Sequence, residues 1–579
     1  MKTKYTSHLP IVTFLFFFVI NFSFSSTCSA IGSIKFISPT DTASIQVNLN
    51  QKLGPMKPMW ANFGYDEADY TFMKDGKKLL TKLSKLSPVP VNIRVHYLLA
   101  TGNGVPRPKW SSTNAYIVNS KGQPVYNWKI VDKIFDTFVH RGIHPFVEIG
   151  FMPKALSTHP NPYEPTWSPK PPHGKEMTGY TYPPKSYSKW ADLISHWVQH
   201  CIKRYGKKQV ESWYWEVWNE PDISYWHGTK QQYFKLYDYT VNAVKKVLPD
   251  AIVGGPASTS PRNNHAEKFL KDFLEHCSTG KNYVTGKNGA PLDFISFHAK
   301  GSPKVVNGHV QMGMSYELRD VTRGFQIVSH SSRFSNLPIV ISEADPEGCA
   351  GCSSQYYPHN DYRNGTMYSS YTADMFSRIY ALADEYHVNL KGALSWSFEF
   401  ENQPWFAGFR ALATHGVDKP VLNVFRMFGM MGGDRVRVQS DQSVSSVQII
   451  ENGVHNGEPD INGMASKTGH SASVLVWNYY GATVPGKASN IKISVKGIPA
   501  KKVLLHQYRI DKTHSNSYTL WKQMGSPQHV TKSQYAKLEQ AGQLHMQTSP
   551  EWLHVSDNGT ATIRISLPRR GVSLLQLSW

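Results

Sequence analysis

The stretch W-Y-W-E-V-W-N-E-P-D, residues 213–222, joins an aromatic run to an Asn-Glu-Pro corner. Large aromatic side chains prefer burial, and Glu is almost never buried among them without a partner or a function. Residues 212–218 therefore predict a buried strand, and Asn219 and Glu220 would leave its C-terminal end. The pattern indicates a strand that holds a functional corner in place.

Outward from this stretch, strand-like apolar runs alternate with amphipathic helical segments, such as 187–205 and 233–247. Buried strands separated by helices imply a parallel sheet. Eight such units predict an α/β fold of the (β/α)8 TIM barrel type. A doubly wound open sheet is the alternative, but the chain has no G-x-G-x-x-G fingerprint. The eight runs are 59–64, 91–97, 144–150, 212–218, 251–255, 293–298, 338–343 and 392–398.

The pattern changes after the barrel, which is predicted to span residues 56–431. Residues 432–579 contain short alternating segments between turns, for example 471–479 and 501–510. This pattern predicts a C-terminal antiparallel β-sandwich. Residues 31–55 include one alternating segment, S-I-Q-V-N-L-N, and we expect this N-terminal strand to associate with the sandwich.

Residues 1–30 have the three parts of a signal peptide. Lys2 and Lys4 precede an apolar run at 11–20, and small residues follow up to Ala30. The run is too short to be a permanent membrane helix. We expect a secreted, periplasmic or cell-surface protein with no integral membrane segment after the signal is removed. Lipoprotein anchoring at Cys28 fits the preceding residues poorly.

The formal net charge is +20 at pH 7. A basic surface attracts polyanions such as acidic polysaccharides. The charge is spread along the chain, and no Lys/Arg run indicates a nucleic-acid partner. A solvated basic surface is the alternative interpretation.

Four cysteines follow the signal segment, and an exported protein can pair them. C-A-G-C, from Cys349 to Cys352, would close a tight disulfide loop. A zinc half-site or a redox pair is a weaker interpretation because no second C-x-x-C is present. Cys201 and Cys277 lie in helix-like segments and are expected to be core residues.

Two carboxylates end predicted barrel strands. Glu220 follows the fourth strand and Glu343 ends the seventh, so both would face the mouth of the barrel. Glycoside hydrolysis requires such a pair, with one carboxyl protonated and the other ionised. A surface salt bridge or a helix cap would explain either Glu alone, but not two at these positions.

Several separate motifs resemble glycoside hydrolase family 39, which contains β-xylosidases and α-L-iduronidases. They are P-F-V-E-I-G-F-M-P-K-A-L (145–156), W-Y-W-E-V-W-N-E-P-D, Y-F-K-L-Y (233–237) and V-G-G-P-A (253–257), and the resemblance covers about residues 45–430. It implies a retaining exo-acting hydrolase of oligo- or polysaccharides that uses no metal and no cofactor.

The resemblance also implies roles for individual residues. Glu220 matches the general acid/base and Glu343 the nucleophile. Asn219 matches a residue that binds the 2-hydroxyl of the reacting sugar, and Arg94 is expected to orient a carboxylate or form a buried ion pair. The complete set of substrate-binding candidates is Asn219, His298, His96, Lys300, Trp396 and Glu399.

The sugar is the open question within the family. The motif F-M-P-K-A-L (151–156) and residues 415–425 resemble β-xylosidases, whereas E-A-D-P (343–346) and H-A-K-G (298–301) resemble iduronidases. Lys300 would pair with the carboxylate of a uronic acid, or with a local Asp. We expect release of xylose from β-xylosides of plant or algal polysaccharide fragments. The alternatives are a uronic-acid-releasing enzyme acting on acidic or sulfated polysaccharide, and a non-catalytic carbohydrate-binding protein.

Overall fold

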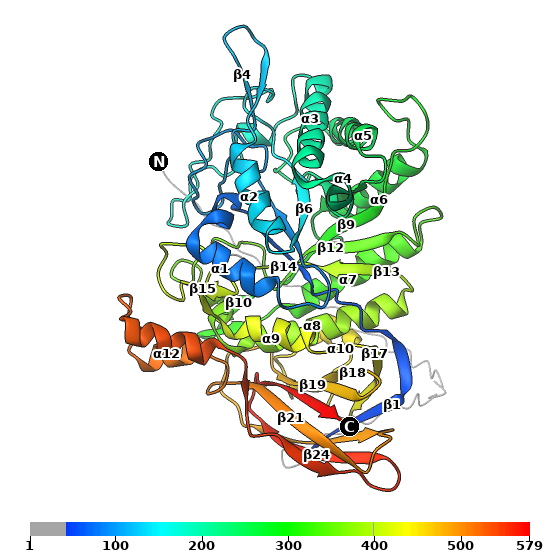
Figure 1. Ribbon diagram of the computed structural model, residues 1–579, viewed down its shortest axis with the longest axis vertical. Coiled ribbons are helices and arrows are strands. Elements are labelled where there is room, and N and C mark those ends of the chain that lie inside the picture. The colour runs from blue at the N-terminus through cyan, green and yellow to red at the C-terminus, as the bar shows by residue number, and fades with distance from the viewer. Residues whose placement is uncertain (1–41, 398) are drawn as a thin grey trace, which may run out of the picture. The chain divides into compact units, whose positions relative to one another are not determined.

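Nine parallel strands form a nearly closed barrel in the computed structural model, which describes residues 42–397 and 399–579 (Figure 1). The order of the strands is β13-β12-β9-β8-β7-β6-β3-β2-β14. Because β13 and β14 are separated by one residue, they act as one stave, and the predicted (β/α)8 barrel is confirmed. The strands are β2 Asn62–Tyr65, β3 Asn92–Val95, β6 His144–Ile149, β7 Tyr214–Val217, β8 Ile252–Ser258, β9 Phe294–Lys300, β12 Pro338–Asp345, β13 Asn389–Ala393 and β14 Ser395–Trp396.

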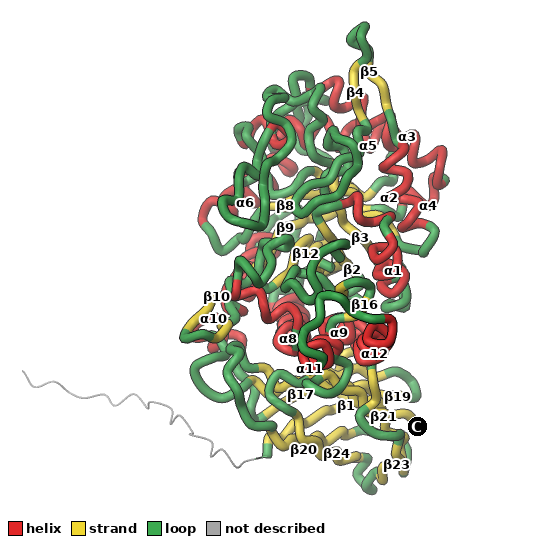
Figure 2. The backbone as a smooth tube through the Cα atoms, turned by 90° about the vertical axis from the view of Figure 1, so that its left-hand side faces the viewer, coloured by secondary structure: helices red, strands yellow, loops and turns green. Residues whose placement is uncertain are grey.

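A helix follows each stave, and Figure 2 shows these helices around the strands. The helix predicted at 187–205 has these bounds, because Ser186 caps its first turn and Gly206, with φ of 85°, ends it. The helices are α1 Lys74–Leu83, α2 Lys129–Val139, α3 Tyr187–Tyr205, α4 Lys207–Glu211, α5 Lys230–Val247, α6 Asn264–Thr279, α7 Met314–Ser329, α8 Thr366–Glu385 and α9 Pro420–Gly429. Short elements in the connecting loops are η1 Ala68–Phe72, β4 Tyr116–Val118, β5 Pro124–Tyr126, η2 Gly179–Thr181, β10 Lys304–Val306, β11 His309–Gln311, η3 Pro358–Asn364, β15 Ala413–Thr414 and β16 Val417–Asp418.

The barrel interior changes from apolar to charged along its axis. Phe146, Phe294 and Val340 form one buried cluster between strands. Two residues beyond Phe146 on the same strand lies Glu148, which is in register with Glu216 of β7. Because side chains two apart on a strand share a face, the apolar layer supports a layer of buried carboxylates nearer the C-terminal mouth.

The second sheet has ten strands and is mixed rather than purely antiparallel. The N-terminal strand β1 pairs antiparallel with β17 and parallel with β20, so it lies between two strands from the C-terminal region (Figure 1). The predicted antiparallel sandwich is corrected in one respect, because β1 and β20 pair in parallel, whereas the other pairs of this sheet are antiparallel. Inward-facing residues of most of these strands share one apolar core.

The strands of this sheet are β1 Ala43–Pro55, β17 Asp434–Ser440, β18 Asp460–Lys467, β19 Ser471–Tyr479, β20 Ser489–Lys496, β21 Lys502–Ile510, β22 His545–Met546, β23 Glu551–His554, β24 Thr560–Leu567 and β25 Val572–Ser578. The region also contains α10 Ser446–Asn452, α11 Ser517–Gln523 and α12 Lys532–Gly542, which the sequence pattern did not predict.

Helices α8 and α9 lie between the barrel strands and this sheet (Figure 2). Arg378 of α8 bonds Asp374 at 2.7 Å and Asp460 of β18 at 2.9 Å. The indole Nε1 of Trp477 donates to the same Asp460 at 3.1 Å. These buried contacts hold the helix that follows the Glu343 strand.

The predicted signal peptide at 1–30 lies outside the described residues. Within the part of the chain that the structure describes, no helix has the length and apolar character needed to cross a membrane.

Candidate active site

The corner after β7 is strained and firmly held. Trp218 and Glu220 have φ of 72° and 45°, in the left-handed region that non-glycine residues rarely adopt. The Glu220 N–H donates to Ala257 O at 2.9 Å, and the Trp218 indole donates to Tyr225 O at 2.9 Å. The buried tryptophans of the stretch thus fix a backbone turn that directs Glu220 into the mouth of the barrel.

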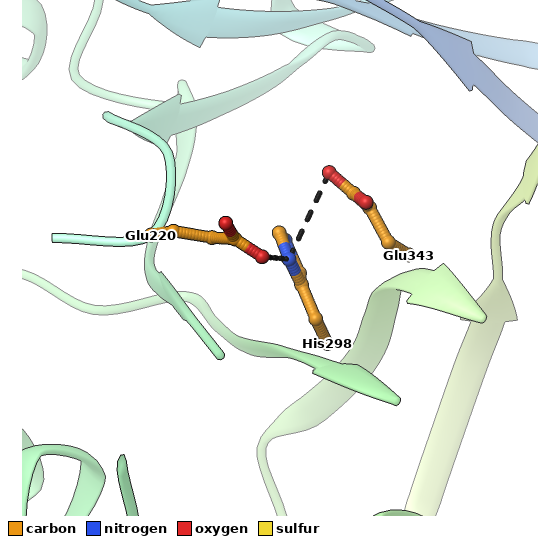
Figure 3. Close-up of side chains that lie close together, drawn as sticks. All are labelled: Glu220, His298 and Glu343. Carbon is orange, nitrogen blue, oxygen red and sulfur yellow. Dashed lines mark hydrogen bonds and ion pairs between the residues drawn. The ribbon is translucent and has the colours of Figure 1, made fainter. Parts of the chain in front are cut away.

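Glu220, His298 and Glu343 converge at the C-terminal ends of β7, β9 and β12 (Figure 3). His298 Nδ1 lies 2.8 Å from Glu220 Oε1 and 3.7 Å from Glu343 Oε1. One oxygen of each carboxylate and the ring nitrogen all lie within 4.8 Å of one another. The two carboxylates predicted from the sequence are therefore neighbours, and the candidate His298 lies between them.

The separation of the carboxylates bears on the chemistry. Retaining glycosidases place their two carboxyl groups about 5–5.5 Å apart, whereas inverting enzymes leave about 6.5–9.5 Å for a water molecule. A closest approach within 4.8 Å fits the retaining arrangement.

The environment of Glu343 favours its ionised form. Its Oε2 accepts from the Lys300 ammonium, and its Oε1 lies 3.3 Å from an Arg94 nitrogen. Burial alone would raise the pKa of Glu343, but His298, Lys300 and Arg94 together hold that pKa well below its usual range. A carboxylate kept ionised in this way suits a nucleophile.

Glu220 is less enclosed than Glu343. The Glu220 side chain is 16% exposed, whereas that of Glu343 is 7% exposed. Within the cluster, Glu220 contacts His298 through a hydrogen bond. The more open carboxyl lies where a leaving group would depart.

Arg94 of β3 connects the whole cluster from inside the barrel. Its guanidinium bonds Glu216 at 2.5 Å and Asn219 at 3.0 Å, and it lies 3.2 Å from Glu148. Burial opposes the charge, but Glu216, Glu148 and Glu343 raise the pKa of Arg94 above its usual value. Its predicted role as an ion-pair partner of carboxylates is thus observed.

His96 lies against the same guanidinium. Its Nε2 is 2.7 Å from Arg94 and its Nδ1 is 3.2 Å from Asp66. Burial lowers the pKa of His96 to about 4, so the imidazole is neutral at pH 7 and Nε2 accepts the Arg94 proton. Glu148 lies 2.9 Å from Nε2, and burial raises the pKa of Glu148 well above its usual range. His96 is therefore a buried support of the site.

Asn219 presents its amide toward the site. Its Oδ1 accepts from Arg94, and among the described residues no hydrogen bond occupies its Nδ2. Because a carboxamide carries two donor hydrogens on that nitrogen, Nδ2 is available for a sugar hydroxyl.

Lys300, at the end of β9, is buried and already paired. Its ammonium contacts Glu343 and lies 3.3 Å from Asp345 Oδ2. The predicted local Asp partner is therefore observed, and the same ammonium also lies beside the candidate nucleophile. Any substrate carboxylate would share this cation with Glu343.

Arg410 is a site residue that the sequence reasoning missed. It lies 3.8 Å from Glu343 Oε2 and 3.5 Å from Asp345, whereas Arg94 approaches Glu343 Oε1. It follows the last barrel strand within a loop, and nothing in the local sequence F-A-G-F-R-A-L distinguishes it from a surface Arg. Only its position after the final stave indicated the mouth of the barrel.

Trp396 forms the floor of the cluster. Its ring lies beneath three cations, at 5.9 Å from Arg94, 5.7 Å from Lys300 and 5.2 Å from Arg410. The side chain is fully buried, at 0% exposure. Trp396 therefore supports the three cations through their attraction to the ring face, and its contact with substrate stays a prediction.

Glu399 is not brought to this cluster, which corrects its prediction as a substrate-binding residue. Its Oε1 accepts from the Gly416 N–H, and it lines a small cavity with residues of α1. Burial raises the pKa of Glu399 to about 8. Glu399 therefore makes its contacts with Gly416 and beside α1.

The grouping of Glu220, His298 and Glu343 also has the donor atoms of a metal site. Three cationic groups, Lys300, Arg94 and Arg410, already neutralise Glu343. A divalent cation would be repelled by these charges, so the donor set fits a protein-neutralised carboxylate pair better than a metal centre.

The C-A-G-C segment forms the Cys349–Cys352 disulfide, one of the pairings considered from the sequence. Arg410 is held by this loop, since its N–H donates to Ala350 O at 3.2 Å and its guanidinium to Glu347 O. Ala350 packs against Trp396. Cys201 and Cys277 are buried free thiols, as expected.

A TIM barrel with paired carboxylates at the ends of its fourth and seventh strands is the architecture of a retaining glycoside hydrolase. The family model "Glycosyl hydrolases family 39" matches residues 43–557. The chain therefore belongs to glycosyl hydrolases family 39 and is a glycosidase whose substrate is a saccharide.

Curated relatives that cover most of this chain include β-xylosidases and an α-L-iduronidase. The chain is 27% identical to a β-xylosidase of Geobacillus stearothermophilus over 498 residues, which cover 84% of this chain and 86% of that protein. It is 23% identical to the α-L-iduronidase of Mus musculus over 535 residues, which cover 85% of this chain and 75% of that protein.

Solved structures share the fold. A monomeric β-xylosidase from Caulobacter crescentus superposes with a TM-score of 0.71 at 22% identity, covering 92% of this chain and 99% of that one. The GH39 enzyme from Xanthomonas axonopodis pv. citri gives 0.70 at 23% identity, covering 93% and 97%.

Proposed function

We propose that the protein is a retaining, exo-acting β-xylosidase that releases xylose from the ends of β-xylosides. The observation that carries the reaction type is the His298-bridged pair of Glu220 and Glu343, within 4.8 Å of each other. The choice of xylose is supported by the similarity to β-xylosidases over most of the chain.

In the first step, Glu343 attacks the anomeric carbon while Glu220 gives its proton to the leaving oxygen. The bond from carbon to the leaving oxygen breaks, and an ester bond between the sugar and Glu343 forms. Lys300 and Arg94 keep Glu343 ionised beforehand, and His298 holds Glu220 by a hydrogen bond at 2.8 Å.

In the second step, Glu220 takes a proton from water, and the resulting nucleophile attacks the same carbon. Glu343 leaves as a carboxylate, and the sugar is released with its original anomeric configuration. The Asn219 amide would hold a sugar hydroxyl in both steps, because its Oδ1 is fixed by Arg94.

The exo mode is supported by the similarity to β-xylosidases over most of the chain.

A second candidate is a uronide hydrolase, and Lys300 and Arg410 favour it. Both cations lie beside Glu343 and are shared with Asp345. Two buried cations next to the reacting carbon would stabilise a sugar carboxylate at the expense of the Asp345 pairing. An acidic or sulfated polymer would also complement the net charge of +20.

Initial rates on aryl β-xyloside, aryl α-L-iduronide and aryl β-glucuronide separate the two candidates. Preference for the xyloside supports the main proposal, and preference for a uronide supports the second. A protein that binds xylo-oligosaccharides and turns over none of the three would instead be a carbohydrate-binding protein.

Export is part of the proposal and rests on the sequence pattern of residues 1–30. Expression of the full chain followed by N-terminal sequencing of the protein outside the cell tests it. A mature N-terminus near residue 31 is the expected result, and retention of the uncleaved chain inside the cell contradicts it.

A further inference from the structure

Three aromatic rings form a stack beside the candidate active site. The ring centroids of Trp167 and His173 lie 6.4 Å apart at 18°, and those of His173 and Tyr357 lie 5.6 Å apart at 23°. The Tyr357 hydroxyl lies 3.0 Å from His173 Nε2, which fixes the stack. All three side chains are half-buried, so part of each remains open to solvent.

The stack is assembled from two loops at the mouth of the barrel. Trp167 and His173 belong to the long connection after β6, and Tyr357 to the connection after β12, the strand that carries Glu343. Strands β7, β8 and β9 lie between β6 and β12 in the sheet, so these loops face one another across the C-terminal end (Figure 1). Loops at this end build the binding sites of TIM barrels.

A chain of contacts joins the stack to the Glu220 corner. Lys109 lies over the Trp167 ring at 5.2 Å, and its ammonium bonds Glu176 at 2.8 Å. Glu176 accepts from the Tyr225 hydroxyl at 2.9 Å. Tyr225 belongs to the same loop as Glu220, and its carbonyl anchors Trp218.

A second set of contacts joins the stack to the Glu343 side. The disulfide loop lies under Trp167, because a Cβ on Gly351 would be 3.7 Å from the Trp167 ring. The same loop holds Arg410, which lies beside Glu343. The stack is therefore connected through side-chain and loop contacts to both carboxylates of the candidate active site.

The direction of substrate entry assigns the stack to one end of the substrate. Glu343, at 7% exposure, is more buried than Glu220, at 16%, so the sugar that is attacked occupies the inner end of the site. The leaving group departs from the side of Glu220, which must protonate it. The stack is linked to this side through Lys109, Glu176 and Tyr225, and the exposed parts of its rings supply an apolar contact for a sugar.

We propose that Trp167, His173 and Tyr357 form a binding site for the leaving-group sugar of an oligosaccharide substrate. The inference rests on the proposed function and extends it, because it names the surface that distinguishes an oligosaccharide from a simple glycoside. Lys109 and Glu176 would give this site its polar edge.

Two substrates with the same reacting sugar test the proposal. Xylobiose has a leaving-group sugar, whereas β-xylosyl fluoride has none. We expect Trp167→Ala to lower kcat/KM for xylobiose by about 10-fold and to leave kcat/KM for the fluoride within about twofold. Retained turnover of the fluoride also shows that the variant is folded.

Two further variants sharpen this test. Tyr357→Ala is expected to act like Trp167→Ala, and Tyr357→Phe, which keeps the ring, to retain most of the xylobiose activity. Trp552→Ala is the matched control, because Trp552 is 60% exposed on β23 of the second sheet. Equal losses on both substrates, or no loss on either, would overturn the proposal.

A binding measurement separates this inference from the proposed function. Calorimetry on Glu343→Gln is expected to show tighter binding of xylobiose than of xylose, with the difference removed by Trp167→Ala. If Glu343→Gln gives this binding result but the native protein hydrolyses neither xylobiose nor β-xylosyl fluoride, the leaving-group site is supported and the β-xylosidase activity is overturned. Equal binding of xylose and xylobiose would overturn the leaving-group site. Binding of neither sugar would overturn both the leaving-group site and the choice of xylose as the reacting sugar.

Discussion

The Nδ1 atom of His298 lies 2.8 Å from the Oε1 atom of Glu220. The same nitrogen is 3.7 Å from Glu343, so a single imidazole touches both carboxylates of the reaction. An imidazole at this position orients one carboxyl by a hydrogen bond and lies beside the other. His298 is therefore a link between proton donation and nucleophilic attack.

Replacement of His298 is expected to slow turnover but not to abolish it. His298→Phe deletes a hydrogen bond to a carboxylate, which is worth about 1.5–3 kcal/mol. We expect kcat to fall by about 10- to 100-fold, with an altered pH profile. Initial rates across pH 4–9 check this, and a variant with native kcat and an unchanged profile would show that the contact has no catalytic role.

The two carboxylates should respond differently to the leaving group. Glu220→Gln removes general acid catalysis, which contributes about 10²–10⁴-fold, so hydrolysis of substrates with poor leaving groups should fall by that factor. A dinitrophenyl leaving group departs without being protonated. Formation of the glycosyl-enzyme from a dinitrophenyl glycoside should therefore proceed at a nearly native rate in Glu220→Gln. Glu343→Gln should abolish both, and burst kinetics of the two variants distinguish the roles.

Lys300 is expected to set the acidic limb of the pH profile. Burial raises the pKa of Glu343, while His298, Lys300 and Arg94 lower it further than burial raises it. Removing one cation in Lys300→Met lets the pKa rise, so the acidic limb of kcat/KM should move up by about 1–3 pH units. Lys496→Met, an exposed change on β20, is the control. If the acidic limbs of Lys300→Met and Lys496→Met coincide, Lys300 does not set the acidic limb of the pH profile.

The Cys349–Cys352 disulfide should support activity through Arg410. Reduction would loosen the loop whose Ala350 and Glu347 carbonyls hold this Arg beside Glu343. Loss of one positioned charged contact predicts a fall in kcat/KM of about 10-fold. Alkylation and mass spectrometry establish that this pair is reduced, and full activity of the reduced, alkylated protein would refute the prediction.

Glu399 should matter for stability and not for turnover. Burial raises its pKa from 4.5 to about 8, so the folded state binds a proton that the unfolded state has lost. Stability then falls as pH rises between these values, by about 1.4 kcal/mol per pH unit from this group. Glu399→Gln should remove this slope. The Tm of the variant relative to that of the native protein should therefore increase from pH 6 to pH 8. Native kcat/KM is expected, and a large loss would return Glu399 to the site.

Local pattern was sufficient for the elements and for the two reacting carboxylates. The apolar runs around residues 212–218 and 338–343 became β7 and β12, because burial on both faces of a strand requires continuous apolar sequence. Glu220 and Glu343 could be found because each stands at the end of such a run. Helix 187–205 was likewise predicted to its bounds by its apolar spacing, and in the structure Ser186 caps its first turn.

Contacts between distant segments could not be predicted in the same way. Arg410 reaches the site only because the loop after β14 packs against the Cys349–Cys352 loop after β12, and no local periodicity records that approach. Glu399 shows the reverse case, since its neighbours in sequence suggested the site and the loop carries it beneath α1. The parallel pairing of β1 with β20 also joins segments more than 400 residues apart.

The sequence by itself therefore determined the barrel, its order of strands and which carboxylates end the fourth and seventh, because hydrophobic periodicity is a local property of the chain. Only the tertiary structure decided which charges surround them. Arg94, Lys300 and Arg410 converge on Glu343 from three separate segments, and electrostatic interaction depends on distance in space rather than on separation along the chain.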